Sequence, residues 1–468
     1  MFTLGSRTCI WLGPLLVACS GAAFSGAETD SSEEATDAGA VGRSGPDAEE
    51  PEPEVGGRPT GTGGASAGGA GARPGDGGAP DSSPSGPGGS GGASDPGHSE
   101  GGAGAPGTEP VGGAAGAGEG GMPPVGLPEP TCPGTAPGCV DDWVGAFGRS
   151  GAVDGVAGEA RFEVISGVTS AGGFVYVLDN QAVRRANIET AEVSTFAGQL
   201  NIVGAEDGTG ASALFHNPVG ITTDGTYLWV ADSENFVVRR IEIATQKVTT
   251  LTGRLGEAGA DDGGPGVASF EEMRDLTYDG RYLYLVESTN NAVRRIDPQT
   301  GTVFTVAGGN DKGLSDGLGP LAEFNAPRYI EAIGPRQVFV SDTDNDRPRF
   351  CDGSNNDGGG LLFVTSPLGD DPGFQDGIGR SALFRRPRGL AFDGKNLLVA
   401  DTDNFVIRSV NLGSDTVTTI AGTAGVAGHQ VGVGTNAQFD KPFDLHYDAE
   451  SRALFIAEGS VLRRMYHR

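Results

Sequence analysis

The sequence predicts an all-β fold, a six-bladed β-propeller closed by an N-terminal strand that completes the last blade. Three observations lead to this prediction. A phenylalanine recurs six times at intervals of 53 to 60 residues, a strand-like run follows each copy, and a segment near residue 140 matches a strand that the last repeat lacks. Repeats of this length, each holding several short strands, are typical of propeller blades.

Each repeat opens with a turn and its phenylalanine. The six phenylalanines are Phe162, Phe215, Phe270, Phe324, Phe384 and Phe439. An Asp-Gly pair stands eight residues before the first five, at Asp154, Asp207, Asp262, Asp316 and Asp376, whereas the sixth repeat has Val431-Gly432. Aspartate in such turns bonds nearby backbone amides. We therefore expect these carboxylates to stabilise their own turns.

The middle of each repeat is a strand that ends in an acid, as in YLWVAD, YLYLVE, QVFVSD and NLLVAD. These runs are apolar on both alternating faces, which favours burial between stacked blades. An asparagine follows three residues after the acid, and an arginine follows seven residues after it at Arg239, Arg294 and Arg408 or five at Arg184 and Arg463. We interpret these residues as turn caps and ion partners. Calcium loops, suggested by Asp342–Asp346, are the alternative, but the ligand density is low.

The repeat closes with a strand of the form V-x-T-x-A-G, as in VSTFAG, VFTVAG and VTTIAG. Each unit thus contains about four short strands separated by turn residues. The pattern F-x-x-P-x-G, strand, D-x-x-N, I-R-R, V-x-T-x-A-G resembles the NHL repeat over residues 140–468. This resemblance implies a six-bladed NHL-type propeller, most similar in layout to secreted or surface NHL proteins of bacteria.

The ring is predicted to close through its two ends. The last repeat stops at VLRRMYHR without its closing strand, and Val140–Gly145 aligns with Val193–Gly198. The N-terminal segment should therefore complete the C-terminal blade, because closure removes free sheet edges.

The first residues indicate export. Arg7 precedes a ten-residue apolar stretch that is too short to span a bilayer. Leu16-Val17-Ala18-Cys19 resembles the lipobox of bacterial lipoproteins, which implies cleavage before Cys19 and lipid attachment to it. Ser20 in place of aspartate favours, by the same resemblance, the outer membrane or cell surface. An ordinary secretory signal with a chance cysteine is the alternative.

The predicted organisation has four parts: a signal peptide at 1–18, a disordered Gly/Ala/Pro-rich acidic tether at 19–131, a cysteine-bounded loop at 132–139 and the propeller at 140–468. The tether lacks the apolar surface that would offset its ordering entropy. Cys132 and Cys139 enclose six residues and should form a disulfide in an oxidising compartment. Cys351 aligns with buried aliphatic residues, so we expect a buried thiol.

Residues that are not shared by all repeats are the candidates for a functional site. Arg274, Arg328 and Arg388 stand four residues after the phenylalanine in three consecutive repeats, at the start of the predicted innermost strand. They could meet at one mouth of the channel and bind an anion. Asp275 and Asp444 lie close enough in register to neutralise these arginines, and the alternative is therefore that the three bind no ligand. Glu331, in the predicted inner strand of the fourth repeat, is a singular carboxylate of interest, with a solvated or paired side chain as the alternative. The Asn/Gly insert after Cys351 could be a binding loop, with a tolerated insertion as the alternative.

Catalytic patterns are sparse. The histidines His216, His429, His446 and His467 occupy unequal repeat positions, no G-x-S-x-G motif accompanies a triad, and we predict no catalytic residue, metal or cofactor. We expect a lipid-anchored, monomeric propeller in the cell envelope that binds an extracytoplasmic protein or an anionic ligand. A metal-dependent hydrolase or lyase with its site in the channel, and a purely structural envelope role, are the alternatives. The formal charge of −29 argues against nucleic-acid binding.

Overall fold

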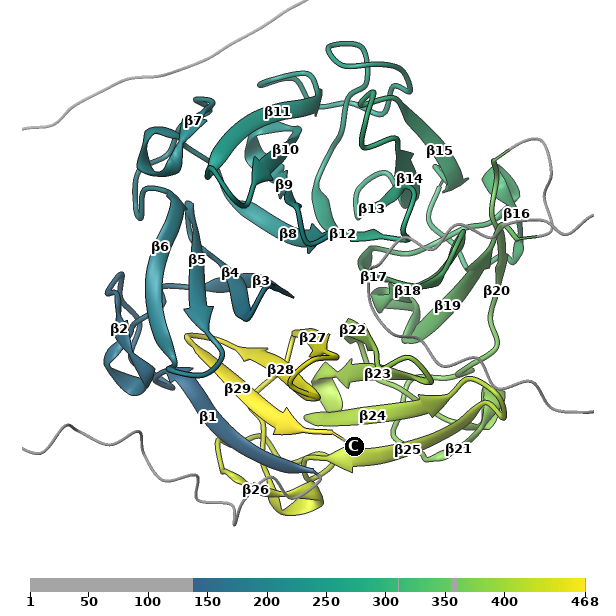
Figure 1. The fold of residues 1–468 in the computed structure, drawn as a ribbon. Coiled ribbons are helices and arrows are strands. Elements are labelled where there is room, and N and C mark those ends of the chain that lie inside the picture. Colours follow the sequence, from purple (N-terminus) through teal and green to yellow (C-terminus); the bar gives the residue numbers. More distant parts are fainter. Residues whose placement is uncertain (1–137, 310, 355–359, 468) are drawn as a thin grey trace, which may run out of the picture. The chain divides into compact units, whose positions relative to one another are not determined.

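The six repeats fold into six antiparallel sheets that follow one another around a ring (Figure 1). The computed structural model describes residues 138–309, 311–354 and 360–467. The predicted signal peptide and tether, with Cys19 and Cys132, lie outside the described residues, as does most of the Asn/Gly insert of the fourth repeat. The predicted six-bladed propeller is confirmed.

Within each blade the chain runs from an inner strand to an outer strand. Blades one to three contain β3 (Ile165–Ala171), β4 (Phe174–Asp179), β5 (Ala182–Asn187) and β6 (Glu192–Gly198); β8 (Pro218–Thr223), β9 (Tyr227–Asp232), β10 (Val237–Glu242) and β11 (Lys247–Gly253); and β12 (Met273–Tyr278), β13 (Leu283–Glu287), β14 (Ala292–Ile296) and β15 (Val303–Gly308). Blades four to six contain β17 (Pro327–Gly334), β18 (Gln337–Asp342), β19 (Arg347–Asp352) and β20 (Phe363–Thr365); β22 (Pro387–Phe392), β23 (Asn396–Asp401), β24 (Val406–Asn411) and β25 (Thr416–Ala421); and β27 (Asp444–Asp448), β28 (Ala453–Glu458) and β29 (Val461–Tyr466).

The blades also contain short strands and turns that the sequence did not indicate. Five blades gain a two-residue edge strand against the outer strand: β2 (Gly155–Val156), β7 (Gly208–Thr209), β16 (Gly317–Leu318), β21 (Gly377–Ile378) and β26 (Gly432–Val433). A 3-10 turn follows each: η1 (Ala157–Glu159), η2 (Gly210–Ser212), η4 (Gly319–Leu321), η6 (Gly379–Ser381) and η8 (Gly434–Asn436). Three more connect the second and third strands: η3 (Ser233–Asn235), η5 (Thr343–Asn345) and η7 (Thr402–Asn404).

The predicted ring closure is confirmed. β1 (Cys139–Gly145) is the outer strand of the sixth blade and pairs antiparallel with β29, with Val140 opposite Met465 and Gly145 opposite Val461. Figure 1 shows β1 and β29 side by side in that blade. Closure leaves the ring without an unpaired blade edge at its seam.

The hydrophobic core is divided among the blade interfaces. Each of the six buried clusters combines residues of two neighbouring blades; one at the seam, for example, joins Trp143 and Val144 to Phe162 and Phe455. The second strand of each blade is buried on both faces, as its continuous apolar pattern predicted.

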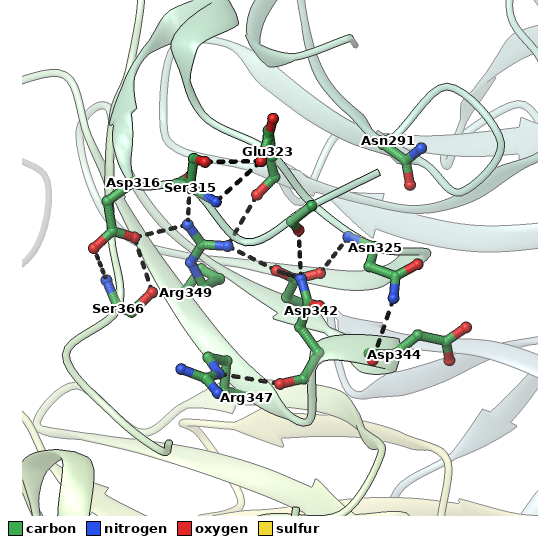
Figure 2. Close-up of polar contacts among 12 residues, drawn as sticks. Asn291, Ser315, Asp316, Glu323, Asn325, Asp342, Asp344, Arg347, Arg349 and Ser366 are labelled. Carbon is green, nitrogen blue, oxygen red and sulfur yellow. Dashed lines mark hydrogen bonds and ion pairs between the residues drawn. The ribbon is translucent and has the colours of Figure 1, made fainter. Parts of the chain in front are cut away.

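The repeated arginines are buried ion partners, as predicted. In blade four, Arg349 donates to Asp342 at 2.8 Å and to Asp316 at 2.7 Å (Figure 2). Its guanidinium also lies 5.4 Å from the ring centroid of Phe324. Equivalent contacts surround the other five arginines, Arg184, Arg239, Arg294, Arg408 and Arg463, all of which are at most 1% exposed. Four features of the repeat, the turn aspartate, the phenylalanine, the strand-end acid and the arginine, thus form one structural unit.

One expectation about this unit is corrected. The aspartates of the Asp-Gly pairs do not bond the amides of their own turns but reach the outer strand of the same blade. Asp154 accepts the backbone N–H of Thr195 at 3.0 Å and the Arg184 guanidinium at 2.7 Å, and Asp207 accepts the N–H of Thr250 at 3.1 Å. The reason is that Arg184 and its copies bring positive charge to each aspartate, and ionic hydrogen bonds are the stronger ones.

The sixth blade replaces the missing aspartate with a residue of the closing strand. Asp142 of β1 lies 3.1 Å from Arg463 and 2.8 Å from His429. The strand that closes the ring therefore also supplies a carboxylate that the C-terminal repeat lacks.

In the described part of the chain, no helix has the length and apolar character needed to cross a bilayer.

Candidate functional site

The inner strands place one register position of every blade around a cavity of about 320 Å³. This position lies four residues after each phenylalanine, and its six occupants are Ser166, Val219, Arg274, Arg328, Arg388 and Phe443. We call this cavity the arginine mouth. The three arginines that the sequence places at one channel mouth all line this cavity, and their role as an anion site stays a prediction.

The arginines differ in their partners. Arg274 forms an ion pair with Glu272, and its Nε lies 3.3 Å from the Ser288 hydroxyl. Arg328 and Arg388 form no ion pair with a described residue, and the Nε of each is buried without a hydrogen-bond partner there. Burial and then the neighbouring charges of Arg274 and Arg388 lower the pKa of Arg328. The three charges are thus close enough to repel one another.

The expected neutralisation by Asp275 and Asp444 is corrected. Both carboxylates line a different cavity and form no ion pair with the three arginines. Asp275 accepts the backbone N–H of Ile330 at 3.1 Å, and Asp444 accepts that of Val168 at 2.9 Å. Each carboxylate thus joins its blade to the next, and the tightness of the inner ring, which brings these amides within reach, was not visible in the sequence.

A second cavity, of about 430 Å³, is lined by later residues of the same inner strands. We call it the polar mouth. The residues seven positions after the phenylalanines are mostly polar here: Thr169, Thr222, Thr277, Glu331 and His446. The two cavities share no lining residue.

Three carboxyl groups of the polar mouth, those of Asp275, Glu331 and Asp444, are poorly solvated. Burial raises the pKa of Asp275 to about 7 and that of Glu331 to about 8, and it also raises the pKa of Asp444. The carboxylates also raise one another's pKa: Asp275 does so at Asp444 and at Glu331. Glu331 is the one residue at this register position that carries a carboxyl group. It accepts the Phe392 N–H at 3.1 Å and so joins blade four to blade five.

A serine, a histidine and an aspartate meet at the polar mouth, which sequence reasoning missed. The Ser170 hydroxyl lies 2.8 Å from Nε2 of His446 and donates to Asp448 at 2.7 Å. Ser170 is 276 residues from His446, so only ring closure brings them together. The order is Asp–Ser–His, whereas a nucleophilic triad needs histidine between the other two. The serine proton already goes to Asp448, and the cluster lacks the arrangement of an activated nucleophile.

Residues 138–309, 311–354 and 360–467 contain no preformed metal site. Within these ranges no three His, Cys, Asp or Glu side chains are grouped closely enough to hold a metal ion.

The two described cysteines, Cys351 and Cys139, are both buried. Cys351 is fully buried among aliphatic residues of blades three and four, and burial raises its pKa to about 12, which agrees with the predicted inert thiol. Cys139 begins β1, is fully buried and is disulfide-bonded. Its expected partner Cys132 and the expected lipid site Cys19 lie outside the described residues, so the pairing and the lipidation stay predictions.

Comparison with known proteins supports the repeat assignment. No protein-family model matches the chain. It is 27% identical over 284 residues to Protein SUPPRESSOR OF QUENCHING 1, chloroplastic, of Arabidopsis thaliana, covering 56% of this chain and 26% of that protein. It is 27% identical over 291 residues to NHL repeat-containing protein 2 of Bos taurus, covering 54% of this chain and 39% of that protein. The chain therefore spans less than half the length of these curated relatives.

Solved structures share the fold. A Bacteroides thetaiotaomicron protein of unknown function superposes with a TM-score of 0.53 at 20% identity, covering 70% of this chain and 75% of that one. An auxiliary nutrient binding protein from Bacteroides ovatus superposes with a TM-score of 0.52 at 15% identity, covering 70% and 76%. At these identities the solved structures show a shared fold alone, and the resemblance to NHL repeats is supported by the sequence relative that is named for them.

Proposed function

We propose that this NHL-type propeller is a membrane-anchored binding module, displayed on the cell surface or in the periplasm, that takes a small organic anion in the arginine mouth. The observation that carries the proposal is the pair of arginines without carboxylate partners, Arg328 and Arg388, in a protein with a formal charge of −29. Acidic groups are abundant, yet none from the described residues lines this cavity.

Electrostatics favours an anion there. Three guanidinium groups that face one cavity repel each other, and a bound anion would relieve that repulsion. Arginine also presents paired N–H donors that match a carboxylate or phosphate, and such charge-assisted bonds are stronger than neutral ones. The unpaired Nε–H groups of Arg328 and Arg388 are donors that an anion could satisfy.

The rest of the cavity indicates what the anion carries. Val164, Ile165, Val219 and Phe443 complete the lining opposite the basic residues in the ring order. A cavity with apolar walls and a few polar groups is the usual form of a small-molecule site. The arrangement therefore favours a carboxylate attached to a compact apolar body over a highly charged inorganic ion.

The comparisons are compatible with a binding role. One relative is named NHL repeat-containing protein 2, and one solved structure of the same fold is described as an auxiliary nutrient binding protein. A propeller fold hosts many functions, so the argument rests on the cavity.

The test is calorimetric titration of the full chain with benzoate, hexanoate and succinate. We expect binding of at least one, and a loss of roughly tenfold or more in the Arg328→Ala/Arg388→Ala variant. Arg281→Ala, at an exposed arginine on Tyr282, is the matched control and should bind as the wild type does. Equal binding by the double variant and the wild type, or no binding of any of the anions, would reject the proposal.

A further inference from the structure

The polar mouth contains hydrogen-bonding groups that the protein leaves unused. Thr169 is only 3% exposed and lines this cavity, yet its hydroxyl has no hydrogen-bond partner among the described residues. The hydroxyl of Thr222, at the equivalent position of the next blade, also has none there. Each hydroxyl can both donate and accept a hydrogen bond, so these two remain available to a ligand that enters the cavity.

His446 adds an acceptor. Because the Ser170 hydroxyl donates to Asp448, its oxygen is left to accept the Nε2–H of His446. Burial lowers the pKa of His446 to about 4, so the ring is neutral near pH 7 and its Nδ1 carries a lone pair. No described residue donates to this nitrogen. Two hydroxyls and one ring nitrogen thus remain for a ligand.

The carboxyl groups do not make the site a cation trap. Asp275 accepts the N–H of Ile330, Asp444 accepts those of Val168 and Leu445, and Glu331 accepts that of Phe392. The bonds to Ile330, Val168 and Phe392 join neighbouring blades, whereas the bond to Leu445 lies within blade six. Two further carboxyl groups line the cavity: Asp448, which accepts the Ser170 hydroxyl, and the exposed Glu450. Neither lysine nor arginine lines the described cavity, so an anionic ligand has no counter-charge either.

Two aromatic rings complete the lining. Tyr278 and Tyr447 both stand eight residues after their phenylalanines, in blades three and six, which are opposite in the ring. Tyr278 packs against Trp229 with ring centroids 5.1 Å apart, and Tyr447 packs against His467 at 6.0 Å. Held rings of this kind offer flat apolar faces beside polar groups.

We propose that the polar mouth is a second binding site, for a neutral polyhydroxylated ligand of the size of a mono- or disaccharide. Open hydroxyls and a ring nitrogen of the protein would bond ligand hydroxyls, and the tyrosine faces would contact ligand C–H surfaces. A volume of about 430 Å³ lies within the usual range of small-molecule sites. This site is independent of the anion site, because the two cavities share no lining residue.

The test uses the full chain with D-glucose, D-galactose, sorbitol, maltose and cellobiose as probes. Titration calorimetry and ligand-observed saturation-transfer NMR at millimolar concentration should detect at least one of them. The Thr169→Val/Thr222→Val variant keeps side-chain shape and removes hydroxyls that bond nothing in the described protein, so it should fold as the wild type does. We expect it to weaken binding about 10- to 100-fold, at about 3- to 10-fold per lost hydrogen bond.

Controls separate this site from others. Thr418→Val removes an exposed, unpartnered hydroxyl on the outer strand β25 and should leave binding unchanged. Arg328→Ala/Arg388→Ala should also leave sugar binding unchanged, so a failed anion site would not disturb this result. The inference is overturned if no probe binds, if choline, spermidine or Ca²⁺ binds while the neutral probes do not, or if the double threonine variant binds as tightly as the wild type.

Discussion

Single residues at one register position give this propeller its chemistry. Four residues after the phenylalanine, the backbone is equivalent in all six blades, but the occupants range from Phe443 and Val219 to three arginines. Three positions further along the strand, the residue also differs between blades and is threonine, glutamate, alanine or histidine. Residues that recur in every blade instead build the blade, as Arg349 does with Asp316 and Asp342.

Glu331 should make the free energy of unfolding of this protein depend on pH. Burial raises its pKa from an ordinary 4.5 to about 8, so the folded protein holds this proton more tightly than the unfolded chain does. The stability that this group contributes is therefore complete below about pH 4.5 and is lost as pH rises through about 8. Glu331→Gln cannot ionise and keeps an oxygen for the Phe392 amide.

Urea unfolding at both ends of this pH range tests the prediction. The wild type should lose roughly 1–3 kcal/mol more than Glu331→Gln does between acidic and alkaline conditions, a range discounted for the water that reaches the cavity. Glu189→Gln, at an exposed glutamate, should keep the wild-type dependence. Identical pH profiles for wild type and Glu331→Gln would show that the carboxyl ionises normally.

Among the elements, β1 makes three contributions to the fold. It completes the sheet of the sixth blade, and it brings Asp142 to the buried Arg463. It also contributes Trp143, which is 5% exposed and packs on Phe455 with ring centroids 4.7 Å apart.

We predict that Trp143→Ala costs about 3–5 kcal/mol of unfolding free energy, because it empties a large buried volume. Deleting Val140–Gly145 should be more severe, since it exposes a strand edge and leaves the Arg463 charge without Asp142. Phe147→Ala, at a ring 39% exposed, should cost far less. Deleting residues 20–130, whose composition predicts no packed core, should leave the melting temperature nearly unchanged. Similar melting temperatures for the two deletions would contradict the role given to β1.

The whole molecule is strongly acidic, and it is proposed to stay at a membrane through its N-terminus. The Leu16-Val17-Ala18-Cys19 match to the lipobox motivates this proposal. Two or more acyl chains are needed for stable anchoring, and the mature terminus of such proteins would supply them.

Mass spectrometry of the mature protein should therefore find an acylated N-terminal Cys19. Cys19→Ser should move the protein from the membrane to the soluble fraction, because the acyl acceptor is lost. Cys9→Ser, within the predicted signal peptide, should leave the fractionation unchanged. An unmodified mature peptide that begins at another residue would rule out lipid anchoring at this position.

The sequence by itself determined the fold, because a propeller repeats one local unit and its signals lie within a single repeat. The phenylalanine, the strand-end acid and the arginine are separated by short and nearly constant intervals, and the strand missing after Arg464 has a visible counterpart at Val140. The convergence of Arg274, Arg328 and Arg388 followed from the same logic, since equal register means equal place around the ring.

Only the tertiary structure decided which groups are satisfied. It paired Arg274 with Glu272 while leaving Arg328 and Arg388 without an ion partner in the described part of the chain, and it turned Asp275 and Asp444 toward backbone amides of neighbouring blades. It also joined Ser170 to His446 across 276 residues of chain. Such pairings depend on the distance between adjacent inner strands and on side-chain direction. Both are set by packing the whole ring, so no single repeat encodes the pairings that join different blades.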